Sequence, residues 1–149
     1  METNKNTRIQ DHFIREVQVN YRSTQQTKRS VREKDDVADF VREVLVDNSR
    51  EHFVALYLDA VHQVSCYSII STGTANRCLA EPREIFQRAI VAGAVAVIVA
   101  HNHPSGDLTA SDADVRVTER LRKAGECLGI PVLDHVIVTD DDSVSVTVF

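Results

Sequence analysis

The feature that most constrains the fold is an unbroken apolar run, AVAVIVA, at residues 94–100. A strand with one face in water alternates apolar and polar side chains, whereas a strand covered on both faces is apolar throughout. The run therefore predicts a central strand in a sheet with helices packed on both sides. The sequence His101-Asn102-His103-Pro104 follows it directly, so metal-binding side chain types stand at the end of the most buried element.

The remaining pattern predicts a mixed α/β domain. Apolar residues recur at the helical period in three stretches, at residues 35–47, 81–93 and 111–128. Pro82 lies near the first position of the second stretch, and Gly129 follows the end of the third, as is typical of helix ends. Short runs that carry β-branched residues predict further strands at residues 51–59, 63–71, 131–140 and 143–149. We therefore expect a mixed β-sheet with helices packed on it in one domain at residues 35–149.

Residues 1–34 differ in charge from the rest of the chain. They carry eight Lys and Arg residues against four Asp and Glu residues, whereas residues 35–149 carry nine against eighteen. Alternation of apolar and polar residues predicts an edge strand near residues 14–21. Because the folded part is acidic, we interpret the basic leader as a solvated arm and do not favour nucleic acid as a partner.

Composition also bears on the compartment. No apolar run reaches the roughly 18 residues that a membrane span needs, and the first 20 residues contain no apolar signal segment. We expect a soluble, cytoplasmic protein with no membrane association. The three cysteines, Cys66, Cys78 and Cys127, are scattered and form no C-x-x-C motif, so neither a disulfide nor a zinc–thiolate site is expected.

The residues after the central strand have the spacing of a metal site. In an extended segment, side chains two residues apart project to the same side, so His101 and His103 converge. Pro104 keeps His103 out of the helical region. Two imidazoles form half of a tetrahedral zinc site, and Asp114 in the first turn of the next helix would supply a third ligand. The alternative is that Ser111 and Asp114 merely form a helix-capping box.

The combined pattern, His101-x-His103, seven residues and then Ser111-x-x-Asp114, resembles the signature of the JAMM (MPN+) zinc metalloprotease superfamily. The segments HNHPSG, PREIFQRAI and LDHVIV are similar to sequences of the bacterial RadC-like (JAB domain) branch of this superfamily. The resemblance covers residues 35–149. The resemblance implies a JAMM-like (cytidine deaminase-like) fold, a three-layer mixed β-sheet flanked by helices. It also implies Zn²⁺ held by His101, His103 and Asp114.

The same resemblance implies two catalytic residues. Glu51, at the start of a predicted strand, would accept and return protons, and the Ser111 hydroxyl would stabilise an oxyanion. By sequence alone Glu81 and Glu84 compete with Glu51, but acids at a helix start have a simpler explanation in the helix dipole. The implied activity is a zinc-dependent metallopeptidase that hydrolyses peptide or isopeptide amides of a protein substrate through a metal-activated water.

Other histidines receive structural interpretations. His135, next to Asp134 in an apolar strand, is interpreted as a buried histidine that is paired with another polar group. The alternative is that it orients a metal ligand without touching the metal itself. His12, His52 and His62 show no partner in the sequence and are predicted to be superficial, with His52 facing away from Glu51.

Two other functions stay open. One is a DNA-associated accessory protein of repair or mobile-element biology, with or without metal-dependent phosphodiesterase activity. Longer members of the RadC-like branch carry an N-terminal helix-hairpin-helix segment for which residues 1–34 leave no room, and this weakens the DNA hypothesis. The other is an interaction scaffold of the kind formed by metal-free relatives, which lack the ligands found here. The substrate and the oligomeric state are left open.

Overall fold

The computed structural model describes residues 14, 16–73 and 80–147. In this part of the chain, strands of one mixed sheet lie in the order β1-β3-β2-β4-β5-β6. Their bounds are β1 Arg29–Ser30, β2 Glu51–Leu58, β3 Gln63–Gly73, β4 Ala96–Asn102, β5 Val132–Val138 and β6 Ser143–Ser145. The helices are α1 Lys34–Val44, α2 Pro82–Val91 and α3 Asp112–Leu128. The predicted α/β architecture is confirmed.

The apolar run forms the centre of the sheet, as predicted. Every residue of β4 is buried, and the strand continues through His101 and Asn102. It pairs antiparallel with β2 on one side and parallel with β5 on the other. A strand with neighbours at both edges and helices on both faces has no contact with water, which explains why its sequence carries no polar alternation before His101.

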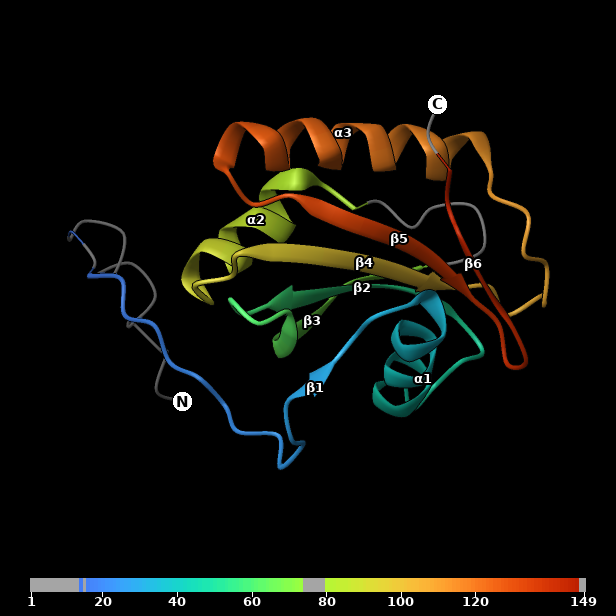
Figure 1. Ribbon diagram of the computed structural model, residues 1–149, viewed down its shortest axis with the longest axis horizontal. Coiled ribbons are helices and arrows are strands. Elements are labelled where there is room, and N and C mark those ends of the chain that lie inside the picture. The colour runs from blue at the N-terminus through green and yellow to red at the C-terminus, as the bar shows by residue number, and fades with distance from the viewer. Residues whose placement is uncertain (1–13, 15, 74–79, 148–149) are drawn as a thin grey trace, which may run out of the picture.

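The helices cover opposite faces of the sheet, which makes the three layers (Figure 1). Helix α1 packs on one face with Val54, Leu56 and Ala100 in a first core cluster. Helices α2 and α3 pack on the other face with Phe53, Tyr57 and other residues in a second cluster. In the register of the sheet, Phe53 is opposite His101. The His101 side chain therefore belongs to the face covered by α2 and α3, where α3 begins.

The N-terminal prediction needs a correction. The described residues of the 14–21 range form no strand, and the first strand is β1, whose Arg29 and Ser30 pair with the start of β3. Ile14 and Val17 are almost fully exposed, so the alternation does not bury a face and has nothing to stabilise it. Tyr21 contacts the domain through its hydroxyl, which donates to the Val91 carbonyl at 2.6 Å.

Two further expectations concern the cysteines and the membrane. Cys66 and Cys127 are free thiols, and Cys78 lies outside the described residues. None of the helices in the described ranges is long and apolar enough to cross a bilayer.

Candidate metal centre

The two histidines converge at the end of β4. Their Nε2 atoms lie 2.9 Å apart, and the ring centroids are 4.7 Å apart. The His103 backbone N–H donates to the Val138 carbonyl at 2.8 Å, which continues the pairing between β4 and β5 beyond the last strand residue. This bond keeps the backbone extended, so both rings project from the same face as the i, i+2 spacing predicts.

One side of the centre comes from the start of α3. The Ser111 hydroxyl accepts from the Asp114 N–H at 3.2 Å, and Asp114 Oδ2 accepts from the Ser111 N–H at 2.8 Å, which completes a capping box. The other oxygen, Asp114 Oδ1, lies 3.3 Å from His101 Nε2. The capping interpretation is therefore correct, and the same carboxylate also reaches the histidines.

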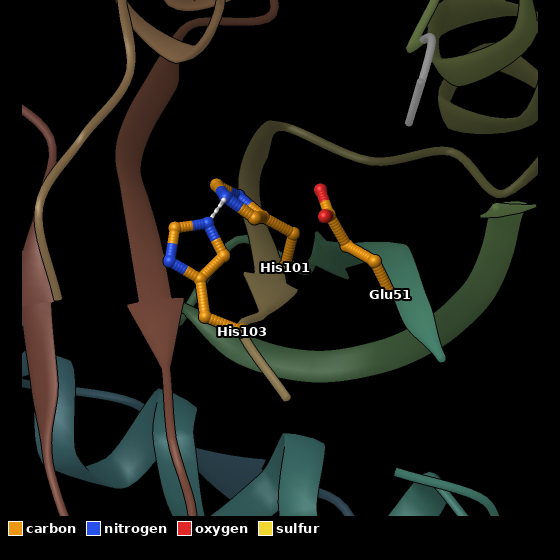
Figure 2. A group of neighbouring side chains, drawn as sticks. All are labelled: Glu51, His101 and His103. Atoms are coloured by element: carbon orange, nitrogen blue, oxygen red, sulfur yellow. Dashed lines mark hydrogen bonds between the residues drawn. The ribbon is translucent and has the colours of Figure 1, made fainter. Parts of the chain in front are cut away.

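Glu51 lies on the opposite side, at the first residue of β2. Its ligand oxygen and the ring nitrogens of His101 and His103 all lie within 4.8 Å of one another. Figure 2 shows its carboxylate directed toward the two rings from the neighbouring strand. Burial raises the pKa of Glu51; nearby His103 opposes this shift, whereas Asp114 adds to it. A largely buried carboxylate with a raised pKa at the edge of a cleft is suited to exchanging protons.

Asn102 holds the start of β2 in place from the other face of the sheet. Its side-chain amide donates to the Arg50 carbonyl at 2.9 Å and accepts from the His52 N–H at 2.7 Å. These bonds link the last residue of β4 to the two residues that flank Glu51. The separation between Glu51 and the histidines is thus set by side-chain bonds in addition to the strand pairing.

The histidine chemistry fits a cation. His103 Nδ1 lies 2.6 Å from the Asp107 carbonyl, which can only accept, so Nδ1 carries the proton. In neutral His103 the Nε2 lone pair then points at His101 Nε2. Two ligand nitrogens on one tetrahedral zinc lie about 3.3 Å apart, close to the observed arrangement. Burial lowers the pKa of His101 to about 4, with Asp114 opposing this shift, so the ring is neutral and available as a ligand at neutral pH.

The two carboxylates are placed differently with respect to this pair. Asp114 Oδ1 is at the spacing from His101 expected between two ligands of one ion. Among the described residues, Glu51 rather than Asp114 forms with His101 and His103 the group whose ligand atoms all lie within 4.8 Å of one another. Both carboxylates, together with Ser111, line a cleft of about 440 Å³. The cluster therefore offers two nitrogen ligands, a carboxylate ligand and a second carboxylate beside them, open to a substrate.

The competing acids lie elsewhere. Glu81 pairs with Arg120 at 2.7 Å and Glu84 pairs with Arg88 at 2.8 Å, and neither lines the cleft. Both acids lie at the start of α2, where the helix dipole favours them, and both also form surface ion pairs.

The prediction for His52 was wrong in one respect. His52 is only 9% exposed; its Nδ1 lies 2.9 Å from the Thr72 hydroxyl and its Nε2 lies 2.7 Å from the Asp47 carbonyl. Pairing with β3 supplied Thr72, which is distant in sequence, and the segment just before β2 supplied Asp47. His62 is exposed in a turn, as expected, and His12 lies outside the described residues.

Two buried residues, His135 and Thr118, lie behind His101, and their connection to the candidate metal centre was not the favoured prediction from the sequence. His135 Nε2 lies 2.8 Å from His101 Nδ1, and His135 Nδ1 lies 2.6 Å from the Thr118 hydroxyl. The preferred interpretation of His135 as a buried, paired histidine agrees with this placement, but its partner is the candidate ligand itself. A histidine inside an otherwise apolar strand was the available signal; Thr118 gave none, because a threonine on a helix is unremarkable.

An α/β sandwich with a His, His and carboxylate cluster at the end of its central strand defines a JAMM-type domain. A sequence model of the RadC-like JAB domain matches residues 31–148, and the chain belongs to that family. It is 44% identical over 116 residues to a UPF0758 protein of Finegoldia magna, covering 78% of this chain and 52% of that protein. It is 47% identical over 116 residues to a UPF0758 protein of Desulforamulus reducens, covering 78% and 51%.

A UPF0758 protein of Bacillus cereus strain G9842 is 42% identical over 120 residues, covering 80% of this chain and 53% of that protein. The chain thus spans about half the length of the curated relatives it matches. The name UPF0758 specifies no reaction. Family membership therefore establishes the kind of domain, and the reaction has to be argued from the site.

Proposed function

We propose that this domain is a zinc-dependent metallopeptidase that hydrolyses peptide or isopeptide bonds of a protein substrate. The observation that carries the proposal is the convergence of His101, His103 and Asp114 with Glu51 beside them in one open cleft. A structural zinc site has four protein ligands, whereas a hydrolytic site has three and leaves a position for water or substrate. His101, His103 and Asp114 as ligands, with Glu51 left free for proton transfer, would make a site of the second kind.

Three residues would hold the ion, namely His101 and His103 through Nε2 and Asp114 through Oδ1. Zinc, when bound, polarises an amide carbonyl and makes water more acidic. The donor set of two imidazoles and one carboxylate suits zinc better than magnesium or calcium, which prefer oxygen ligands alone.

Glu51 would move the protons. Peptide hydrolysis requires a base that takes a proton from water and then delivers it to the leaving amine. The Glu51 carboxylate lies within the ligand cluster but is not needed to complete the ligand set, so its oxygens are available for this transfer. Its raised pKa brings the carboxylate closer to the range in which it can both accept and release a proton.

Ser111 would stabilise the developing oxyanion. Ser111 lines the cleft, and in this structure its hydroxyl donates to Asp114 Oδ2 at 2.7 Å. To donate to a substrate oxygen, the hydroxyl has to rotate about its C–O bond. Asp114 Oδ2 would then keep the Ser111 N–H as a donor, at 2.8 Å.

A nucleic-acid role receives less support. Among the described basic residues of the leader, Lys28, Arg29 and Lys34 each pair with a carboxylate, so their charge is partly neutralised. That function would be favoured if the protein binds DNA at physiological salt, if the affinity falls steeply as salt is added, and if deletion of residues 1–34 abolishes the binding.

The proposal is tested by an unbiased screen of peptide and isopeptide substrates with the zinc-loaded protein. Glu51→Gln should lose about 10²–10⁴-fold in turnover on any substrate found, because the proton carrier is removed. Its zinc content should stay at the level of the parent protein. Glu84→Gln is the matched control, since Glu84 pairs with Arg88 outside the cleft. Full turnover by Glu51→Gln would refute this role for Glu51, and a screen without any amide hydrolysis would refute the peptidase proposal.

A further inference from the structure

A chain of hydrogen bonds runs from the back of His101 into α3. His101 Nδ1 lies 2.8 Å from His135 Nε2, and His135 Nδ1 lies 2.6 Å from Thr118 Oγ1. Thr118 Oγ1 in turn lies 2.6 Å from the backbone oxygen of Asp114. His101 is 1% exposed, and His135 and Thr118 are fully buried, so water does not compete for these bonds.

The direction of the protons follows from the Asp114 end of the chain. A carbonyl oxygen can only accept, so the single Thr118 proton points at Asp114, and the hydroxyl must accept from His135 Nδ1–H. A neutral His135 that donates from Nδ1 has a lone pair on Nε2, which accepts from His101 Nδ1–H. His101 is then left with a bare Nε2 that faces His103 and Asp114, and its 2.9 Å contact with His103 Nε2 is a hydrogen bond only when the His103 nitrogen carries a proton.

We propose that His135 and Thr118 are positioning residues that fix the tautomer of His101, so that its Nε2 is permanently available to the metal. The proposal rests on the metal centre put forward above and adds residues that do not touch the ion. In the opposite tautomer a proton would occupy Nε2 and would have to leave before a cation could bind. Fixing the tautomer in advance removes that competition.

Ring packing supports the same role. The Phe53 ring lies parallel to the His101 ring at 5.9 Å, with 6° between their planes, and it also contacts His135 at 5.3 Å. These contacts restrict rotation of both imidazoles, so His101 cannot easily exchange its two nitrogens by turning over. The chain also ends on the backbone of Asp114, whose side chain faces the same ring. Elements β4, β5 and α3 thus orient two candidate ligands together.

Thr118→Val and Thr118→Ser provide a matched test. Valine has nearly the shape of threonine but lacks the hydroxyl, whereas serine keeps the hydroxyl. Without it, His135 can carry its proton on Nε2 and donate to His101 Nδ1, which drives the His101 proton onto Nε2. Thr118→Val should therefore weaken Zn²⁺ binding about 10–100-fold in competition with a chromophoric chelator, and Thr118→Ser should bind like the parent protein.

A second measurement reads the tautomers directly without any metal. Long-range ¹H–¹⁵N spectra of the chelator-treated protein at one fixed pH should show His101 and His135 protonated on Nδ1 in the parent protein and in Thr118→Ser. In Thr118→Val both protons should move to Nε2. A change in packing alone would not move them. If Thr118→Val does not fold, His135→Leu and His135→Gln replace the pair, and only glutamine should keep an acceptor for His101.

The outcomes separate this inference from the proposed function. A proton on His101 Nε2 in the parent protein, or equal zinc affinity of Thr118→Val and Thr118→Ser, would overturn the inference while leaving the metallopeptidase in place. A parent protein that binds no zinc would overturn the proposed function, and the spectra of the metal-free protein would still decide the tautomer.

Discussion

Asp114 Oδ1 lies 3.3 Å from His101 Nε2, while the other oxygen of the same carboxylate caps α3. A capping role and a ligand role are often treated as alternatives for an acidic residue in a first helical turn, and here one side chain fulfils both. The cap holds the carboxylate in one rotamer before any ion arrives. The conformational entropy of the Asp114 side chain is therefore lost when the helix folds, and not when the ion binds.

Metal content is the first prediction. The purified protein should contain about one zinc per chain, and His103→Ala should lose most of it, because a single imidazole and a carboxylate make a weak site. The measurement is elemental analysis after gel filtration. His62→Asn is the control, since His62 is exposed and asparagine tolerates its φ of 58°. Equal zinc in parent protein and His103→Ala would contradict the site.

The two roles of Asp114 and its partner Ser111 should separate by mutation. Ser111→Ala removes the acceptor for the Asp114 N–H and should lower the free energy of unfolding by about 1 kcal/mol with zinc still bound. Asp114→Asn keeps an oxygen for the Ser111 N–H but loses its charge, so zinc affinity should fall more than about tenfold with a smaller effect on stability. Urea unfolding and chelator competition measure the two quantities. Parallel losses in both variants would show that cap and ligand are inseparable.

Glu51 should titrate at a higher pH than an ordinary glutamate. Burial raises its pKa above the usual 4.5 in the metal-free protein, so it takes up its proton earlier as the pH falls. Added Zn²⁺ should lower the pKa of Glu51, because a nearby positive charge favours the carboxylate. Carboxyl ¹³C spectra follow both changes. Glu43 is the internal reference, since its bond to Arg29 shifts its pKa downward. A Glu51 that titrates below Glu43 would contradict the burial argument.

The metal-free protein should lose stability on acidification from pH 6.5 toward about pH 4. Burial lowers the pKa of His101 to about 4, whereas an unfolded histidine takes up its proton near 6.5. Between these values the unfolded state binds more protons, so the free energy of unfolding falls as the pH falls. Urea unfolding at pH 7 and pH 5 should show a smaller drop for His101→Gln than for the parent protein. The His62→Asn control should keep the full drop.

Local patterns predicted the elements well where burial decided them. The run 94–100 became β4, and the capped stretch from Ser111 became α3, because each pattern matched the environment that the fold supplied. The same reasoning failed near residues 14–21, where apolar and polar residues alternate but the described residues of this range pair with no strand. A periodic pattern states which face a segment would bury, and it does not state whether a partner exists.

The sequence by itself determined the chemistry of the site and the local geometry of each half. The i, i+2 spacing of His101 and His103 in an extended chain and the i, i+3 spacing of Ser111 and Asp114 at a helix start follow from backbone periodicity alone. The family resemblance had implied Glu51, but only the tertiary structure shows how Glu51 and His135 come to lie beside the histidines. The antiparallel pairing of β2 and the parallel pairing of β5 with β4 bring these residues beside His101, and such pairing depends on contacts between distant segments that no local pattern encodes.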